Sequence, residues 1–297
     1  MTDRQQRLDT VAVSSLLLCC LLWGLNQVAA KIGLAEIPPL LQAGLRSLAA
    51  GLLVAVWARL RGIALFSRDG TGTGGLAAGA LFAAEFACIF IGLQFTTASR
   101  MVVFIYLSPF VVALGMNFIA HAERLRALQW LGLLAAFCGV AWAFAEGFTQ
   151  PGAGPRQWLG DALGVVAAVL WAATTLVIRA SRLGSAAAEK TLLYQLAISG
   201  VLLTAAGVAA GEHWPAVLSA RGWGAFAFQA VIVTFASYLL WFWLVRHYAA
   251  TRLAAFTLLT PIFGLLAGVL LLGEPVTARL VLALAAVVLG IALVNRH

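Results

Sequence analysis

Long apolar runs, separated by short breaks, decide what this chain can fold into. Charged residues, prolines and glycine-rich stretches divide the sequence into ten runs of roughly twenty residues, the length an α-helix needs to cross about 30 Å of hydrocarbon. With 63% of its 297 residues hydrophobic and only 10% charged, the chain cannot hide its apolar side chains in a water-soluble core. We therefore predict an all-α integral membrane protein with ten transmembrane helices and only short loops outside the bilayer.

The sequence also contains an internal repeat. A hydroxyl residue and an arginine precede Leu-Ser-Pro in one segment and Leu-Thr-Pro in a later one, at the same spacing, with the prolines at Pro109 and Pro261. A glutamate follows each proline, Glu123 in the first segment and Glu274 in the second. The chain is therefore interpreted as a duplication.

The two copies, residues 1–147 and 158–297, hold five predicted helices each. Because five is odd, the second copy enters the membrane from the opposite side, so the repeats are inverted about a pseudo-twofold axis in the membrane plane. Inverted repeats are a recurring basis of alternating access, with the substrate site near mid-bilayer between the halves. This arrangement predicts a transporter of a small molecule, for which one chain is sufficient.

The distribution of positive charge predicts the orientation. A net charge of +8 could suggest nucleic acid in a soluble protein, but here the positions of the charges matter more than their sum. Most lysines and arginines fall on one side of the membrane when the amino terminus is cytoplasmic. The positive-inside rule therefore predicts that both termini are cytoplasmic, and we expect membrane lipid, not nucleic acid, around the protein.

Glu85 is the most costly residue in the sequence, because it lies close to the middle of a predicted span over 75–97. An ionised carboxylate at the bilayer centre costs on the order of 3 kcal/mol or more, so it should face a partner or a wet cavity, or be protonated. Two interpretations stay open. Glu85 has a structural role, paired with Arg46 or bonded to a neighbouring helix as a neutral carboxyl, or it belongs to a substrate site.

The repeated prolines predict matched bends. Pro109 and Pro261 lack the N–H that would bond the carbonyls of Ile105 and Thr257, and a carbonyl freed in hydrocarbon is costly unless protein, water or substrate satisfies it. The two prolines are therefore candidate hinges and parts of a cavity wall. The alternative is that they only shape helix packing.

Candidate substrate-binding residues are the polar and aromatic side chains near mid-span. A small zwitterion needs acceptors for its ammonium group, donors for its carboxylate and a surface for its side chain. The candidates are Trp23, Asn26, Gln42, Phe82, Glu85, Phe86, Tyr106, Trp171, Thr175 and Tyr238. Taken singly, each aromatic could equally be core or lipid-facing filler. The absence of a mid-span lysine cluster disfavours phosphorylated or nucleotide-sugar substrates.

Four segments resemble the EamA family of the drug/metabolite transporter superfamily. They are WGLNQVAAK, GLRSLAAG, LQFTTASRMVVFIYLSPFVVAL and TRLAAFTLLTPIFGLLAGVLLLGEPV, and the resemblance extends over nearly the whole chain. Among the members, the chain looks most like bacterial amino-acid exporters of the YddG type. The resemblance implies a ten-helix, inverted-repeat exporter of amino acids, aromatic and other mostly neutral ones, and related metabolites. It also implies a location in the bacterial inner membrane, with no cofactor or metal. One departure is His121-Ala122-Glu123, where the family often has Gly-Glu.

Other classes of function stay open to different degrees. A proton-coupled multidrug antiporter for organic cations could use Glu85, although relatives of the small multidrug-resistance type place that glutamate in the first helix. An intramembrane enzyme is poorly supported, because the sequence contains neither His-Glu-x-x-His nor Gly-x-Ser-x-Gly, nor a pair of mid-span aspartates. We therefore expect no catalytic residues. A passive channel would be separated from a carrier by saturation and trans-acceleration.

Overall fold

The computed structural model describes residues 9–67, 69–119, 127–149, 152–248, 257 and 259–294, which form helices joined by short loops. Six helical segments in these ranges are long and apolar enough to cross a membrane, and shorter apolar helices accompany them. The chain is therefore a multi-pass membrane protein, in agreement with its apolar runs.

The helices of the first half follow the predicted spans. They are α1 (Thr10–Gly33), α2 (Pro39–Leu60), α3 (Gly72–Gly92), α4 (Ala98–Ile105), α5 (Ser108–Ile119) and α6 (Ala127–Thr149). Local sequence explains several starts. The Asp9 carboxylate accepts a hydrogen bond from the Ala12 amide at 2.8 Å and caps α1, while the proline pair at Pro38 fits the first turn of α2.

The second half contains a comparable series. It comprises α7 (Gln157–Ala180), a 3₁₀ turn η1 (Arg182–Ser185), α8 (Ala188–Ala209), α9 (Ala220–Ala227), a π-helix η2 (Phe228–Ser237), α10 (Tyr238–His247), α12 (Leu259–Leu272) and α13 (Ala278–Val294). The apolar run over 224–247, for which we expect a single helix, is thus three consecutive segments. The first of them begins before this run because the Ser219 hydroxyl caps α9 by accepting from the Gly222 amide at 3.0 Å.

The helix predicted over 98–120 is interrupted in front of Pro109. Its first part, α4, ends at Ile105, and α5 begins at Ser108 after a two-residue turn. Pro109 cannot donate to the carbonyl four residues earlier, so a break here is the expected result. The matching prediction for Pro261 involves residues 249–256 and 258, which lie outside the described residues.

The helix predicted over 75–97 ends earlier, at Gly92. Thr97 instead caps the next helix, because its hydroxyl accepts a hydrogen bond from the Arg100 amide at 3.1 Å. The sequence between these two residues forms a short connection. The apolar run therefore did not mark where α3 ends, whereas the capping threonine marks where α4 begins.

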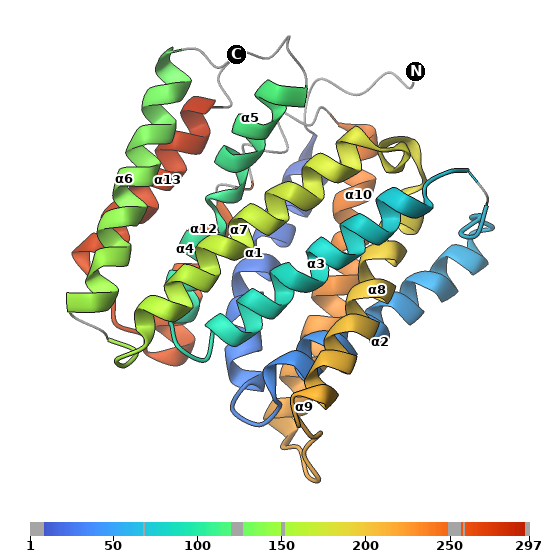
Figure 1. The fold of residues 1–297 in the computed structure, drawn as a ribbon, viewed down its shortest axis with the longest axis horizontal. Coiled ribbons are helices and arrows are strands. Elements are labelled where there is room, and N and C mark those ends of the chain that lie inside the picture. Colours follow the sequence, from blue (N-terminus) through green and yellow to red (C-terminus); the bar gives the residue numbers. More distant parts are fainter. Residues whose placement is uncertain are drawn as a thin grey trace.

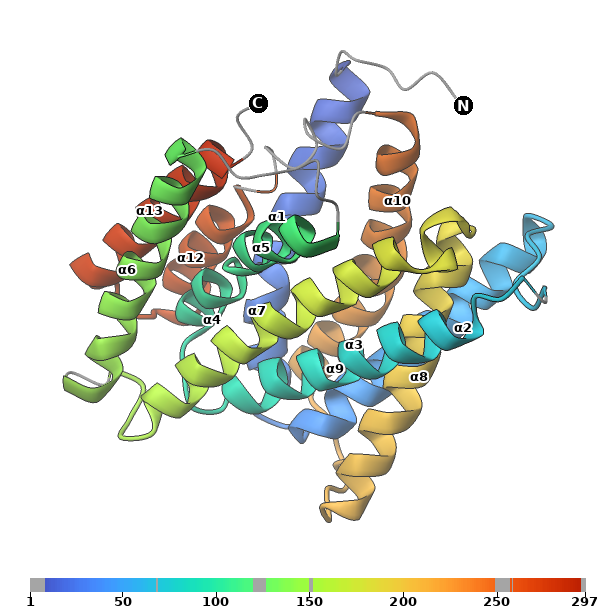
Figure 2. The same ribbon diagram turned by 45° about the horizontal axis from the view of Figure 1, so that its top comes forward.

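The helices form two flanks around a central group (Figures 1 and 2). α6 and α13 lie side by side at one edge, and α2 packs on α8 at the other. Between them, α3 packs along α7, and α1 packs against α12. The central helices are therefore those that border the interior of the bundle.

Glycines allow the central helices to approach closely. A Cβ added at Gly24 in α1 would lie 2.6 Å from the backbone nitrogen of Gly264 in α12. A Cβ at Gly160 in α7 would lie 2.7 Å from the carbonyl oxygen of Gly92 in α3. Small residues at such crossings let helices associate within a membrane through backbone contact.

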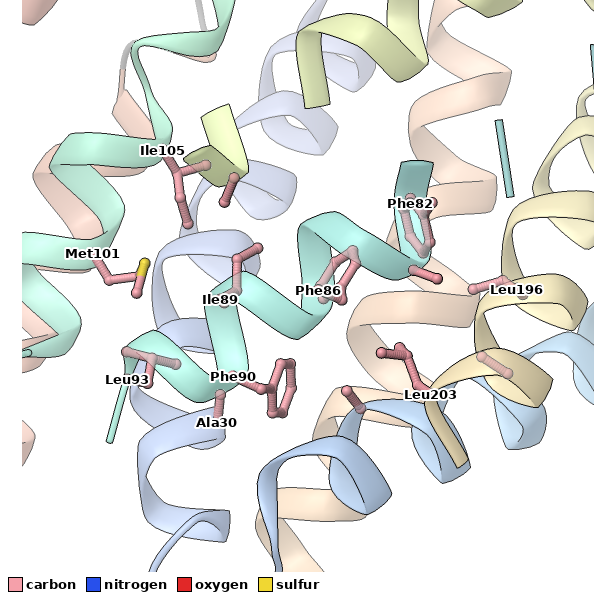
Figure 3. Close-up of a cluster of buried hydrophobic side chains, with 14 of the residues drawn as sticks. Ala30, Phe82, Phe86, Ile89, Phe90, Leu93, Met101, Ile105, Leu196 and Leu203 are labelled. Atoms are coloured by element: carbon pink, nitrogen blue, oxygen red, sulfur yellow. The ribbon is translucent and has the colours of Figure 1, made fainter. Parts of the chain in front are cut away.

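The main hydrophobic cluster is organised around α3. Phe82, Phe86, Ile89 and Phe90 project from this helix toward neighbouring elements, and Leu196 of α8 lies close to the same cluster (Figure 3). Because α3 also carries Glu85, this helix brings apolar packing and a buried carboxylate to the same place.

Candidate functional site

A cavity of about 340 Å³ lies inside the bundle. Its walls come from α1, α3, α4, α7, α8, η2, α10 and α12, so both halves of the chain contribute. Small-molecule sites typically have volumes of roughly 300 to 1,000 Å³ and are mostly apolar with a few polar groups. The cavity therefore has the size of a site for a small metabolite.

Nine of the ten residues predicted from the sequence as substrate-binding line this cavity. They are Trp23, Asn26, Phe82, Glu85, Phe86, Tyr106, Trp171, Thr175 and Tyr238. The structure thus brings together side chains that are far apart in the sequence. That they bind a substrate stays a prediction.

Gln42 lies elsewhere. Its side chain is buried between α2 and the end of α1, where Nε2 donates a hydrogen bond to the Ala30 carbonyl at 3.2 Å. It also lies against Gly33, where a Cβ would meet the Gln42 amide. Gln42 is not among the residues that line the cavity, and its contacts join two helices.

The polar part of the wall contains hydrogen-bond donors, such as Arg179 and Thr260, as well as acceptors. Asn26 Oδ1, Gln27 Oε1 and Glu85 Oε2 are buried and have no hydrogen-bond partner among the residues the structure describes. Buried polar atoms are nearly always hydrogen-bonded in proteins, so three such acceptors around one cavity point to a donor supplied by a ligand. Gln27 was not among the predicted site residues, although its position beside Asn26 in a membrane span was a usable signal.

Aromatic side chains form the apolar part of the wall. Trp23 contacts Tyr238 and Trp241 edge-on, with ring centroids 6.4 and 5.2 Å apart. Tyr106 and Trp171 form another edge-on pair at 5.8 Å. These pairs are preferred aromatic geometries and hold flat apolar surfaces in place for a hydrophobic side chain.

A hydrogen bond from α1 to the π-helix supports this wall. Trp23 Nε1 donates to the Ser237 hydroxyl at 2.9 Å, and that hydroxyl donates to the Val233 carbonyl at 2.6 Å. π-Helical segments are frequent at functional sites, and η2 contributes Val233 to the lining. The orientation of Trp23 is therefore set by a helix of the other half.

Arg46 lies close to the cavity without lining it. Its side chain is fully buried, with Cζ 4.2 Å from the ring centroid of Phe86 and 5.2 Å from that of Phe90. It interacts electrostatically with Glu85, but no ion pair within 4 Å joins the two, and in the described part of the chain none of its three side-chain nitrogens has a hydrogen-bond partner. A direct Arg46–Glu85 ion pair, one of the interpretations of the sequence, is therefore not formed.

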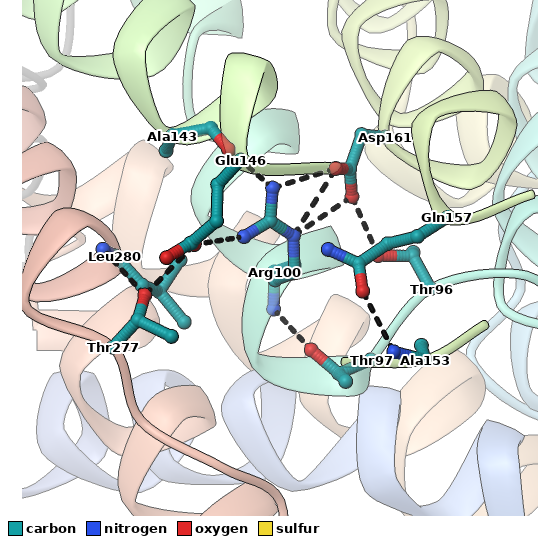
Figure 4. Close-up of polar contacts among 10 residues, drawn as sticks. All are labelled: Thr96, Thr97, Arg100, Ala143, Glu146, Ala153, Gln157, Asp161, Thr277 and Leu280. Carbon is teal, nitrogen blue, oxygen red and sulfur yellow. Dashed lines mark hydrogen bonds and ion pairs between the residues drawn. The ribbon is translucent and has the colours of Figure 1, made fainter. Parts of the chain in front are cut away.

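A second charged group, which we call the Arg100 cluster, lies at another level of the bundle (Figure 4). It comprises Arg100, Glu146, Asp161, Thr96 and Thr277. Arg100 Nη2 lies 2.6 Å from Asp161 Oδ2, and Nη1 lies 2.9 Å from Glu146 Oε2. Arg100 Nε also donates to Asp161 at 3.1 Å, so every guanidinium nitrogen has a partner.

Two threonines complete the Arg100 cluster. The Thr96 hydroxyl donates to Asp161 at 2.5 Å, and the Thr277 hydroxyl donates to Glu146 at 2.8 Å. The cluster thereby connects the α3–α4 segment, α6, α7 and the start of α13. The sequence analysis did not identify it, although its charged members all lie near predicted helix ends on one side of the membrane.

The cavity and the Arg100 cluster occupy different levels along α7. Asp161 lies in the first turns of this helix, whereas the residues of α7 that line the cavity run from Trp171 to Arg179 near its end. Ten residues separate Asp161 from Trp171, which corresponds to about 15 Å along a helix axis. The cavity therefore extends toward the end of the bundle opposite to the Arg100 cluster.

Glu274, the glutamate of the second repeated motif, joins the two halves next to this cluster. Its carboxylate accepts hydrogen bonds from the amides of Ala98 and Ser99 at 2.7 and 2.9 Å and from the Ser99 hydroxyl at 2.6 Å. A carboxylate is favourable at a helix N-terminus, here that of α4. Its counterpart Glu123, in the segment His121-Ala122-Glu123, lies outside the described residues.

The comparisons with known proteins agree with this description. A sequence model of the EamA-like transporter family matches residues 10–145 and 158–296, which confirms the family resemblance. The chain is 29% identical over 281 residues to the uncharacterized transporter YvbV of Bacillus subtilis, with 93% of this chain and 88% of that one covered.

Two Escherichia coli relatives carry more informative names. The chain is 25% identical over 280 residues to the uncharacterized inner membrane transporter YedA, covering 93% of this chain and 87% of that one. It is 25% identical over 268 residues to a protein named probable amino-acid metabolite efflux pump, covering 88% and 87%. A crystal structure with 20% identity aligns over 96% of this chain and 97% of that one with a TM-score of 0.67, which supports the fold.

Proposed function

The chain belongs to the EamA-like transporter family, and from that membership we propose that it exports amino acids and related small metabolites by alternating access. The observation that carries the proposal is the cavity, which combines a carboxylate and amide oxygens with aromatic surface. The oxygens fit the ammonium group of a neutral amino acid, and the aromatic surface fits an apolar side chain. The name of one relative, probable amino-acid metabolite efflux pump, supports the same substrate class, as does the resemblance to exporters of the YddG type.

We propose ten transmembrane helices in two inverted repeats. The helix contacts support this, because α2 packs on α8 and α6 on α13, and each pair holds equivalent positions in the two copies. Likewise α3 of the first copy packs on α7 of the second, and their counterparts in the opposite copies, α9 with η2 and α1, also pack on each other. A pseudo-twofold axis relates contacts in this way.

We propose that this conformation faces the cytoplasm. With both termini cytoplasmic, the Arg100 cluster is on the outer side, and the cavity extends from mid-bilayer toward Arg179 and Trp241 on the inner side. Opening to the outside then requires that Arg100 separates from Asp161 or Glu146. Pro109 lies at the break between α4, which carries Arg100, and α5, so it is a hinge in this proposal, with Pro261 as its counterpart.

Uptake by purified protein in proteoliposomes tests the proposal. Labelled tryptophan, phenylalanine and threonine are supplied with and without a pH gradient, and with or without unlabelled amino acid trapped inside. Saturable uptake that the trapped amino acid stimulates is the expected result for a carrier. Uptake that neither saturates nor responds to trapped substrate would indicate a channel instead.

The second candidate is a proton-coupled antiporter for organic cations. It is favoured by Glu85, whose Oε2 has no hydrogen-bond partner among the described residues, in an aromatic-lined cavity. In such an antiporter the carboxylate would exchange a proton for the drug. The same vesicles test it with a cationic dye under a pH gradient. Transport of the dye without transport of any amino acid would replace the proposed function with this one.

A further inference from the structure

We infer that Arg46 is the carboxylate-binding part of the substrate site, and that the Phe86 ring is a movable wall between Arg46 and the cavity. The inference builds on the proposed transport of amino acids and narrows it to zwitterions that present a free carboxylate beside their ammonium group. Arg46 was not among the candidate site residues in the sequence and does not line the cavity in this conformation.

The Arg46 side chain is fully buried, and within the described ranges none of its guanidinium nitrogens makes a hydrogen bond. A buried charge without a partner is strongly destabilising, and aromatic faces replace only part of the lost hydration. A guanidinium in this state is complementary to a planar anion, since it can donate two parallel hydrogen bonds to a carboxylate.

The Phe86 side chain lies between Arg46 and the cavity. Phe86 lines the cavity, and Arg46 Cζ lies 4.2 Å from the centre of the same ring. Figure 3 shows Phe86 between Phe82 and Phe90 along α3, with the Phe82 ring centroid 4.6 Å away. A phenyl side chain moves between discrete rotamers, so a change of χ1 at Phe86 would expose the guanidinium to the cavity.

Glu85 supplies the negative charge that complements Arg46. Glu85 precedes Phe86 on α3 and lines the cavity, with Oε2 unpartnered among the described residues. A bound zwitterion would satisfy both groups, with its ammonium on Glu85 and its carboxylate on Arg46. An organic cation would leave Arg46 unpaired and be repelled by it, and an organic anion would leave Glu85 unpaired and be repelled by it. Arg179, which also lines the cavity, lies near the end of α7 and already has an interaction within the protein. A site of this kind selects zwitterions by rejecting ligands with only one charge.

The first test compares three ligands that share an indole ring, namely tryptophan, tryptamine and indole-3-propionate, in equilibrium binding to purified wild type and Arg46→Met. Wild type is expected to prefer tryptophan. Loss of a charge-assisted contact is worth about tenfold to a hundredfold in affinity, so Arg46→Met should weaken tryptophan binding by that factor and leave tryptamine binding unchanged or improved. Arg46→Lys should recover part of the difference. An unchanged preference for tryptophan over tryptamine in Arg46→Met would overturn the inference.

The second test does not require that Arg46 be altered. Phe86→Leu should raise the affinity for tryptophan and indole-3-propionate relative to tryptamine, because the smaller side chain uncovers Arg46. Phe90→Leu is the matched control, since Phe90 also lies over Arg46, at 5.2 Å, but does not line the cavity. If the relative affinities for the three ligands were the same in both variants and in wild type, the movable wall would be contradicted.

These outcomes separate the inference from the proposed function. Wild type that binds tryptophan, with Arg46→Met retaining the same ligand preference, leaves amino-acid transport standing and removes Arg46 from the site. Wild type that binds tryptamine but not tryptophan overturns both proposals and favours the cation antiporter. Wild type that binds none of the three also overturns both.

Discussion

Two buried arginines of this protein have different surroundings. Arg100 and Arg46 each lie near an aromatic ring, with Cζ 5.5 Å from the Phe104 centroid and 4.2 Å from the Phe86 centroid. Arg100 has carboxylate or carbonyl partners on every guanidinium nitrogen, whereas Arg46 has no hydrogen-bond partner among the described residues. The two arginines are therefore both buried and differ in whether the described residues supply hydrogen-bond partners.

The largest expected effect contrasts these two arginines directly. Arg100→Met leaves two buried carboxylates without their cation, and breaking a buried ion pair costs about 3–5 kcal/mol. Arg46→Met removes a charge that makes no hydrogen bond or ion pair with the described residues, so it should not lower the free energy of unfolding. Denaturant unfolding of both variants in detergent measures the difference. A similar loss of stability in the two would show that Arg46 is also structural.

The carboxylates allow the same contrast. Glu85→Gln is expected to reduce the initial rate of transport about tenfold to a hundredfold, because a charged contact to the ammonium group is lost, while the melting temperature is retained. Asp161→Asn should instead lower the melting temperature, since Asp161 bonds Arg100 and Thr96. Uptake rates and melting curves on the same preparations measure both. Normal kinetics in Glu85→Gln would remove Glu85 from the site.

The prolines test how the two regions are connected. Pro109 lies after the α4–α5 break, with the Arg100 cluster on one side and the cavity residue Tyr106 at the break itself. Pro109→Ala and Pro261→Ala should slow transport several-fold and leave substrate affinity nearly unchanged, because they restore backbone hydrogen bonds at the proposed hinges. Transport rates are compared with equilibrium binding. Unchanged rates in both variants would show that the prolines only shape packing.

The smallest effect concerns an ion pair that joins Asp69, in the α2–α3 loop outside the membrane spans, to Lys190 in the first turn of α8. Lys190 Nζ lies 2.7 Å from Asp69 Oδ2, and this hydrogen bond, followed by that from Thr71, holds the pKa of the Asp69 carboxyl well below its usual range. A depressed pKa means that the contact is present above the usual carboxyl pKa of about 4 and is lost as the pH falls through the lowered value.

Asp69→Asn tests this pair. The protection factors of amides in the α2–α3 loop, which correct for the intrinsic exchange rate, should fall at acidic pH in wild type and depend less on pH in the variant. Transport at neutral pH should stay unchanged, because neither Asp69 nor Lys190 lines the cavity. A large loss of transport would show that this loop takes part in the conformational cycle.

Much of the site could be predicted because depth in a membrane can be read from position in an apolar run. Glu85, Asn26 and the aromatic residues at similar depth converge on one cavity for that reason. Gln42 has the same depth and polarity, yet it faces the end of α1. The depth of a side chain in a span does not determine which neighbouring helix that side chain contacts.

The sequence by itself determined that this chain is a multi-pass helical membrane protein, because its apolar runs have no other stable environment. Its motifs also determined the family, and Pro109 determined where a helix breaks. Only the tertiary structure decided which buried charges are paired. Arg100, Glu146 and Asp161 come from three different helices. Their contact depends on how helices that are far apart in the sequence pack together, which no local sequence pattern records. The same packing left Arg46 behind Phe86, where it lies over an aromatic face and makes no hydrogen bond or ion pair with the residues that the structure describes.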